Sequence, residues 1–444
     1  MKWLYPGLGI KRWILAMLLS LILFLFSFTT IILGVKDITT LWKYKLEGFF
    51  YHLGGYVYVF SIISGIVSLI ILVFAFIKTN QAIIRFLLPK EAEDAKIVNL
   101  MYNHRFLKRG PKLVVIGGGT GLSVLLRGLK KYTSNITAVV TVADDGGSSG
   151  RIRGEMGILP PGDIRNCLIA LSESEPILEK VFQHRFKTGV GLEGHNLGNL
   201  FLAAFTEIMG FEQAVKEMAK VLAVRGKVLP VTLENIVLQA KLKDGGIVWG
   251  ESNISKSRIP IEKISIIPSY AKPLEDTIQA IKEADAIILG PGSLYTSIIP
   301  NLLVTGIEEA IKKSKRPVYY VCNIMTQRGE TENYTALDHV EAIYKHTSSR
   351  FIDYIVVNNK EITSRQKYLY ILEDSVPVKI DKDKLAASKV KVLEGDLLAQ
   401  SNQVRHDPDK LARIILTNLL KEHFRSRSFI DRILLERKLS LKSD

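Results

Sequence analysis

A glycine-rich segment early in the chain has residue types that can bind an anion. The sequence KLVVIGGGTGLSVLLRGLKK (residues 112–131) reads as a strand, a glycine turn and a helix. Glycines at such a strand end let backbone N–H groups approach a phosphate, which the positive end of the helix dipole also attracts. The spacing departs from the dinucleotide fingerprint, because Leu122 stands where a third Gly or Ala belongs. The loop is therefore compatible with ligand binding or with a structural tight turn. Its candidate ligand-binding residues are Gly118, Gly119, Thr120 and Gly121.

A second loop, ADDGGSSGR, follows the next predicted strand at the same edge of the expected sheet. Asp144 and Asp145 could hold a divalent cation against phosphate oxygens, or accept the hydroxyls of a ribose. An ordinary Asp-Gly turn is the alternative. Ser148, Ser149 and Arg151 favour a functional loop, because two hydroxyls and a guanidinium make a good anion receptor.

Two further polar segments precede predicted helices. In ILPPGDIRN, Asp163 is either a site carboxylate or a helix N-cap. In EGHNLGNL, His195 and Asn196 lie between two glycines and Asn199 follows the second, and His195 could transfer a proton, bind a phosphate or be structural.

Two later strand ends repeat the pattern of the first loop. The sequence ILGPGSLYTS carries Gly292, Ser293 and Tyr295 and predicts a second phosphate or sugar loop. The sequence CNIMTQRGET places Asn323 and Thr326 after another apolar run. Polar, glycine-rich loops at several strand ends indicate one shared binding site.

Short Val/Ile-rich runs alternate with helical patterns from residue 112 onward, which predicts an α/β fold with a doubly wound, mostly parallel sheet. Residues 167–223 read as mostly helical. The sequence around Asp244-Gly245-Gly246 predicts a β-hairpin. A late helix is expected to start near Asp407 or Pro408.

The net charge of +15 is concentrated near the two ends of the predicted domain and lacks an aromatic-and-basic RNA-binding pattern. We therefore favour anionic lipid or a phosphorylated small ligand over nucleic acid as partner. Cys167 and Cys322 form no metal-binding motif and fit a reducing compartment.

Two uncharged stretches, Trp13–Val35 and Val57–Ile77, are long enough to cross a bilayer as helices. The first exceeds the apolar region of a signal peptide and lacks a cleavage site. Basic residues outside both spans place the two ends and the main domain in the cytoplasm, at the cell membrane. The predicted parts are a hairpin (1–78), a juxtamembrane linker (79–110), an α/β domain (111–412) and a basic helix or tail (413–444).

Seven motifs in order carry a family resemblance. They are GGGTGLS, VADDGGSSGR, LPPGDIRN, GHNLGNL, GPGSLYTSIIPNLLV, NIMTQRGET and RHDPDKLA. Together they resemble the bacterial gluconeogenesis factor (YvcK-like) family, which is similar to the 2-phospho-L-lactate transferase (CofD) family. The resemblance implies a Rossmann-like domain that binds UDP-sugars such as UDP-N-acetylglucosamine, with a role linking carbon metabolism to cell shape and peptidoglycan synthesis.

The resemblance also implies roles for individual residues. The transferase relatives hold Mg²⁺ with aspartates, and Asp145 and Asp163 match that metal and donor site if the chain is an enzyme. Tyr370 and Arg405 match positions for the sugar nucleotide, although Tyr368 offers a second tyrosine to align. Most members resemble soluble proteins, so the predicted membrane hairpin is a departure.

Two functions follow. The first is a membrane-tethered UDP-sugar-binding regulator that acts through cell-wall synthesis partners, forms a homo-oligomer and binds no nucleic acid. The second is an Mg²⁺-dependent phosphotransferase of the 2-phospho-L-lactate transferase type. Nicotinamide-dependent oxidoreduction is disfavoured because the first loop departs from the dinucleotide fingerprint.

Overall fold

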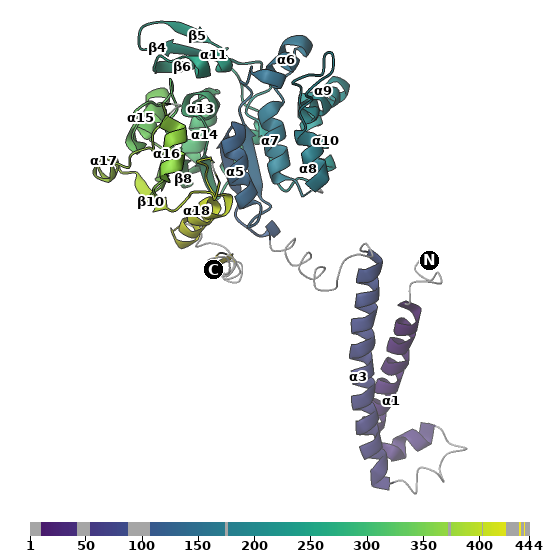
Figure 1. The fold of residues 1–444 in the computed structure, drawn as a ribbon. Coiled ribbons are helices and arrows are strands. Elements are labelled where there is room, and N and C mark those ends of the chain that lie inside the picture. The colour runs from purple at the N-terminus through teal and green to yellow at the C-terminus, as the bar shows by residue number, and fades with distance from the viewer. Residues whose placement is uncertain are drawn as a thin grey trace. The chain divides into compact units, whose positions relative to one another are not determined.

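The computed structural model describes residues 10–41, 54–87, 107–173, 176–371, 374–401 and 403–422, with Leu435, Glu436 and Leu439. The chain divides into two compact units, Met1–Tyr102 and Asn103–Asp444 (Figure 1). The predicted linker from residue 88 to 106, and the tail beyond 422 apart from those three residues, lie outside the described residues.

The N-terminal unit is an antiparallel helix pair. Its helices are α1 (Ile10–Leu41) and α3 (Gly54–Leu87). The Trp13 ring meets the Phe74 ring edge to face at 5.7 Å, and Ser27 Oγ donates to Ser64 Oγ at 3.2 Å. Contacts that run from the start of one helix to the end of the other define the antiparallel arrangement.

Each of these helices contains a stretch that is long and apolar enough to cross a membrane, Arg12–Ile31 in α1 and Val59–Asn80 in α3. Most of their large apolar side chains are exposed, including Phe26 at 61% and Phe60 at 72%. The sequence prediction of two apolar N-terminal helices that could span a membrane is confirmed.

A seven-stranded parallel sheet forms the centre of the second unit, in the order β10-β9-β8-β7-β1-β2-β3. Its strands are β1 (Leu113–Gly117), β2 (Ile136–Val140), β3 (Lys227–Pro230), β7 (Ala286–Leu289), β8 (Val318–Val321), β9 (Tyr354–Asn358) and β10 (Lys391–Gly395). Every residue of β1, β7 and β8 is buried, as expected for strands covered on both faces. The predicted doubly wound α/β fold is confirmed.

Helices flank this sheet in two groups (Figure 1). One group comprises α5 (Gly119–Leu129), α6 (Gly147–Met156), α7 (Gly162–Leu171), α8 (Pro176–Gln183), α9 (Leu197–Met209), α10 (Phe211–Val221) and α18 (Pro408–Glu422). The other comprises α12 (Glu275–Glu283), the π-helix η2 (Leu294–Ile298), α13 (Ile299–Leu303), α14 (Ile307–Ser314), α15 (Ala336–His346) and α17 (Lys382–Ala387). Members of each group contact one another. Helix α16 (Ser364–Ile371) follows β9.

A small antiparallel sheet, β5-β4-β6, is attached to this unit. Its strands are β4 (Val237–Leu242), β5 (Ile247–Trp249) and β6 (Ile261–Ile267), and α11 (Glu251–Lys256) follows β5. The predicted hairpin is confirmed, because Gly245 adopts a φ of +87° and the Asp244 carboxylate accepts a bond from the Gly246 N–H at 2.9 Å.

The late helix begins where it was expected. Pro408 is the first residue of α18, and Asp407 Oδ1 accepts hydrogen bonds from the N–H groups of Asp409 and Lys410, both at 2.9 Å. Asp407 therefore acts as the N-cap. The helix continues to Glu422, across the boundary predicted at residue 412.

Candidate functional site

The loops after β1 and β7 meet at the point where the strand order of the sheet reverses. Strand β1 pairs with β2 on one side and with β7 on the other. Asn301 Nδ2 donates to the Gly117 carbonyl at 3.1 Å, and a Cβ built on Gly121 would lie 2.7 Å from the Pro291 carbonyl oxygen. Crevices at such switch points are where open α/β sheets bind their ligands.

A cleft of about 520 Å³ opens at this junction. The loops that follow β1, β2, β7 and β8 line it, together with residues from α7, α11, α16 and the segment before α18. Of the residues singled out from the sequence, the lining contains Gly118, Gly119, Thr120, Gly121, Asp144, Asp163, Gly292, Ser293, Asn323, Thr326, Tyr370 and Arg405. Motifs spread over nearly 300 residues of sequence thus converge on one site.

The first glycine loop has no space for side chains at its centre. A Cβ built on Gly118 would lie 2.6 Å from both Asp163 Oδ2 and Thr141 Cγ2. Gly119 adopts a φ of +69°, which L side chains rarely take. Helix α5 begins at Gly119, so its first N–H groups lie beside the cleft. The Thr141 hydroxyl beneath the loop is buried, with no hydrogen-bond partner among the described residues.

The side chains of the adjacent Asp144 and Asp145 lie in different surroundings. Asp144 lines the cleft, and its Oδ1 accepts a bond from the Gly146 N–H at 2.9 Å. Asp145 does not line the cleft, because its Oδ1 accepts a bond from the Ser252 N–H at 2.8 Å, at the start of α11. The carboxylate that the resemblance matched to a metal therefore caps a helix of the small-sheet region.

Asp163 lies fully inside the cleft wall, at the start of α7. Burial, followed by the negative charges of Asp144 and Glu251, raises the pKa of Asp163 to about 7. A hydrogen bond from the Gly119 N–H opposes this rise. Burial, followed by the charge of Asp144, also raises the pKa of Glu251. A carboxylate-rich end of the cleft results, and a bound cation or hydroxyl-bearing ligand would stabilise it.

The two carboxylates of Asp144 and Asp163 fit the needs of Mg²⁺, which commonly uses one or two carboxylates and completes its shell with water and substrate phosphates. Within the described parts of the chain, no group of three or more His, Cys, Asp or Glu could hold a metal ion. Any magnesium here would therefore depend on the phosphates of the ligand.

The second polar cluster lies behind the cleft wall. Ser148 Oγ contacts His195 Nδ1 at 3.2 Å and accepts bonds from the Asn196 N–H at 3.1 Å and from Asn199 Nδ2 at 3.2 Å. Arg165 donates to Asn199 Oδ1 at 2.7 Å. All five side chains are buried. The network fixes α6, α7 and α9 against one another, and direct ligand contact by these residues stays a prediction.

Ser149 and Arg151 also lie in this region, and Arg151 acts on His195. Ser149 is buried and accepts a bond from Asn199 Nδ2 at 3.4 Å. Arg151 donates to the Glu193 carbonyl at 2.7 Å. Burial, together with the charge of Arg151, lowers the pKa of His195, so the imidazole is neutral near pH 7. None of these three lines the cleft.

The loop after β7 is tied to the loop after β8. Asn323 Nδ2 donates to the Gly292 carbonyl, and Gln327 Nε2 donates to Ser293 Oγ, both at 2.9 Å. Tyr295 is buried outside the cleft lining, and its hydroxyl pairs with that of Tyr334 at 2.8 Å. Burial raises the pKa of Tyr295, so it remains a phenol.

Another part of the cleft lining is mainly aromatic and apolar. Tyr370 and the exposed Arg405 line it beside Ile324, Met325 and Val404. These apolar side chains belong to a separate small hydrophobic cluster against which Tyr370 packs. This part of the lining therefore offers an aromatic and apolar surface with one cation, in contrast to the carboxylate-rich part.

Sequence reasoning missed Thr141, Glu251, Val404 and His406, which also line the cleft. Glu251 comes from α11, after a strand of the small sheet, and only its glycine neighbour Gly250, with a φ of +87°, marks it as special. His406 is buried, and burial lowers its pKa to about 4. The dipeptide Arg405-His406 in the RHDPDKLA motif could have indicated it.

Comparisons with known proteins show the family and agree with the fold. The family model described as 2-phospho-L-lactate transferase CofD matches residues 113–398. The gluconeogenesis factor of Bacillus subtilis is 53% identical over 314 residues, which cover 70% of this chain and 99% of that protein. A crystal structure of a Bacillus halodurans protein superposes with a TM-score of 0.68 at 51% identity, covering 69% of this chain and 100% of that one.

One relative extends the match toward the N-terminus. A protein of Clostridium acetobutylicum is 48% identical over 424 residues, which cover 94% of this chain and 91% of that protein. Because that alignment leaves out only a small part of the chain, it must include most of the first 102 residues. The chain therefore belongs to the gluconeogenesis factor family, whose α/β domain is of the CofD type.

Proposed function

We propose that this chain is a membrane-tethered regulatory protein that binds a UDP-sugar in the cleft and links carbon metabolism to cell shape and peptidoglycan synthesis. The observation that carries the proposal is the meeting of two glycine loops at the switch point of the sheet. Backbone N–H groups at the start of α5 and around Gly292 supply donors for a diphosphate.

The two ends of the cleft suit the two ends of a nucleotide sugar. Carboxylates such as Asp144 and Glu251 can accept the hydroxyls of a sugar, whereas Tyr370 and Met325 provide a flat apolar surface for a base. Arg405 adds one cation that can reach a phosphate. The volume of about 520 Å³ lies within the range of pockets that hold small organic ligands.

The N-terminal helix pair supports the tethering part of the proposal. Both helices contain a stretch long and apolar enough to cross a membrane, and their exposed apolar side chains would face lipid. We propose that the pair anchors a cytoplasmic domain at the cell membrane, near cell-wall synthesis regulators as partners, and that the protein is a homo-oligomer without nucleic acid.

A second candidate function is an Mg²⁺-dependent phosphotransferase resembling 2-phospho-L-lactate transferase. The specific observation in its favour is the pair Asp144 and Asp163, which share one end of the cleft. Bound Mg²⁺ would supply charge neutralisation for a transferring phosphoryl group. In that function Asp163 would hold the metal with Asp144, and the glycine loop would orient the phosphates.

Calorimetric titration of the full-length chain in detergent micelles tests both functions. The titrants are UDP-N-acetylglucosamine, GDP and NAD, each with and without Mg²⁺, and each complex is then assayed for products. We expect UDP-N-acetylglucosamine to bind without metal and without turnover. Binding of GDP that requires Mg²⁺, followed by transfer of its terminal phosphoryl group to water with release of GMP and phosphate, would replace the regulatory function by the enzymatic one.

A further inference from the structure

The segment 398–406 reaches the cleft with its last three residues. These three residues, Val404, Arg405 and His406, are part of the cleft lining. Arg405 is the one arginine or lysine among the cleft-lining residues that the structure describes. The position of this segment therefore decides where the positive charge of the cleft lies.

The base of the segment is closed by backbone contacts. The Asp407 N–H donates to the Leu397 carbonyl at 2.7 Å, and the Ala399 N–H donates to the Arg405 carbonyl at 2.9 Å. At the far side, the Val404 N–H donates to the Tyr370 hydroxyl at 3.1 Å. The described parts of the segment, 398–401 and 403–406, thus form two antiparallel arms, which are held at their base and, on the far side, by Tyr370.

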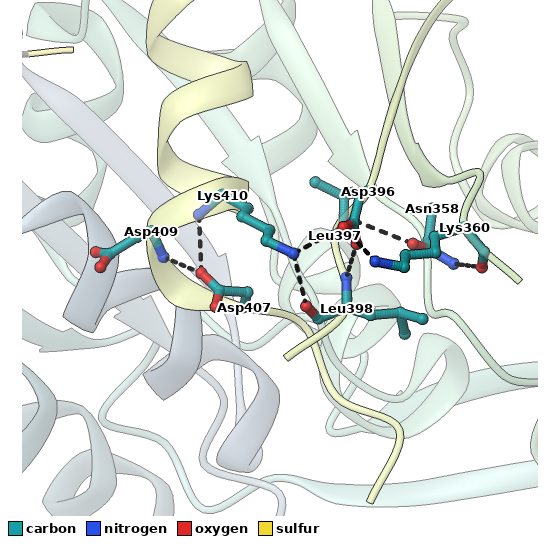
Figure 2. Close-up of polar contacts among 8 residues, drawn as sticks. All are labelled: Asn358, Lys360, Asp396, Leu397, Leu398, Asp407, Asp409 and Lys410. Carbon is teal, nitrogen blue, oxygen red and sulfur yellow. Dashed lines mark hydrogen bonds and ion pairs between the residues drawn. The ribbon is translucent and has the colours of Figure 1, made fainter. Parts of the chain in front are cut away.

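Asp396 holds that base from three directions (Figure 2). Its Oδ2 accepts bonds from Lys360, after β9, and from Lys410, in the first turn of α18, both at 2.9 Å. Its Oδ1 accepts a bond from the Leu398 N–H at 3.2 Å. Lys410 also donates to the Leu398 carbonyl at 3.1 Å. One carboxylate therefore joins the end of β9, the start of α18 and the first residue of the loop.

Two ammonium groups share this single carboxylate. Their hydrogen bonds lower the pKa of Asp396 to about 2, so the carboxylate is ionised throughout the physiological range. Loss of its charge would leave Lys360 and Lys410 facing each other without compensation. Neither Asp396 nor Lys360 lines the cleft, and Lys410 does not either.

We propose that Asp396 is a positioning residue: through Lys360, Lys410 and the Leu398 N–H it holds the Leu398–His406 loop so that Arg405 faces the bound ligand. This inference rests on the proposed function for the identity of that ligand. The ion pairs of Asp396 with Lys360 and Lys410 would then affect the ligand affinity only through Arg405.

Hydrogen–deuterium exchange of the full-length chain in micelles tests the positioning without any ligand. In Asp396→Asn we expect faster exchange at the amides of Ala399 and Asp407, and unchanged exchange in α5. The matched control is Glu394→Gln, since Glu394 lies two residues earlier in β10, pairs with Lys382 and is exposed to a similar degree. Unchanged exchange in Asp396→Asn would overturn the proposal.

A double-mutant cycle with UDP-N-acetylglucosamine tests the effect on the site. We expect Asp396→Asn to weaken binding about three- to tenfold in the wild-type background, and to have almost no further effect in Arg405→Ala. Lys410→Gln should behave like Asp396→Asn. Equal losses in both backgrounds would mean a general structural role and would contradict the proposal.

The two readouts separate the possible failures. If the wild-type chain does not bind UDP-N-acetylglucosamine, the proposed function fails, and the exchange experiment alone then decides whether Asp396 holds the loop. If the wild-type chain binds and the exchange changes without any change in affinity, the proposed function stands and the positioning role is refuted.

Discussion

The two ends of the cleft are built in different ways. The carboxylate end, around Gly118 and Asp163, is tightly packed beneath the cleft, so that a Cβ on Gly118 would clash with Asp163 and Thr141. The Arg405 end lies on a loop whose base is held by partly exposed ion pairs. Buried, tightly packed groups tolerate change poorly, whereas exposed ion pairs contribute little each. We therefore expect substitutions at the first end to affect folding and binding together, and those at the second to affect binding alone.

The largest effect is expected for Gly118→Ala. The added Cβ would lie 2.6 Å from both Asp163 and Thr141, so we expect a loss of stability of about 1–3 kcal/mol and no detectable ligand binding. Thermal unfolding and calorimetry check both results. Gly154→Ala is the control, because nothing lies within 4 Å of its Cβ and alanine favours the helix. Equal behaviour of the two variants would contradict the difference between the two ends.

Asp163→Asn should change the pH dependence of stability. The pKa of Asp163 is raised to about 7 in the folded chain, so the folded state holds a proton that the unfolded state releases near pH 4. The stability that this bound proton contributes to the folded state is therefore fully present below about pH 4. It is lost as the pH rises to about 7, by at most about 1.4 kcal/mol per pH unit.

The variant lacks this proton, so its stability relative to the wild type should increase from pH 5 to pH 8. Unfolding midpoints of the full chain at four pH values measure the difference. Burial also raises the pKa of Glu330 to about 7, so Glu330 adds a similar pH dependence to the stability of both proteins. The difference in stability between the two proteins therefore isolates the contribution of Asp163. A pH-independent difference would show that Asp163 is ionised in the folded chain.

Arg405→Ala should leave the fold intact and weaken UDP-N-acetylglucosamine binding about tenfold, as expected for a charge-assisted contact to phosphate. The unfolding midpoint should stay within about 2 °C of the wild type, because the side chain is exposed. Arg405→Lys separates charge from shape, since lysine keeps the charge but loses the planar pair of donors. An unchanged affinity in Arg405→Ala would remove this end of the cleft from the binding site.

The smallest effect on binding is expected at Asp145. Asp145→Asn should cost about 0.5–2 kcal/mol of stability, because a carboxylate at the start of α11 is weakened as a cap, while affinity stays within twofold. Asp144→Asn, one residue away, should reduce affinity instead. Calorimetry on both variants measures their affinities. A larger loss of affinity in Asp145→Asn than in Asp144→Asn would place Asp145 in the binding site.

The sequence predicted the fold and half of the residues that line the cleft, because glycine loops, buried strands and helix starts are local signals. The residues Gly118, Gly292 and Asn323 were found in this way, and all three line the cleft. The position of Asp145 could not be predicted, because adjacent residues after a strand point in different directions and their partners come from elsewhere. Asp145 meets Ser252, 107 residues later, and the neighbouring Glu251 lines the cleft.

The pairing of β1 with β7 has a consequence for how the chain is made. The Lys112 N–H at the start of β1 bonds to Asp285, 173 residues further along the chain. During synthesis β1 and β2 emerge early, whereas the other edge of β1 has no partner until β7 follows. A chain that stalls or is cut between them exposes an apolar strand edge that can pair with another molecule. Nascent and truncated forms of this protein should therefore depend on chaperones far more than the finished chain does.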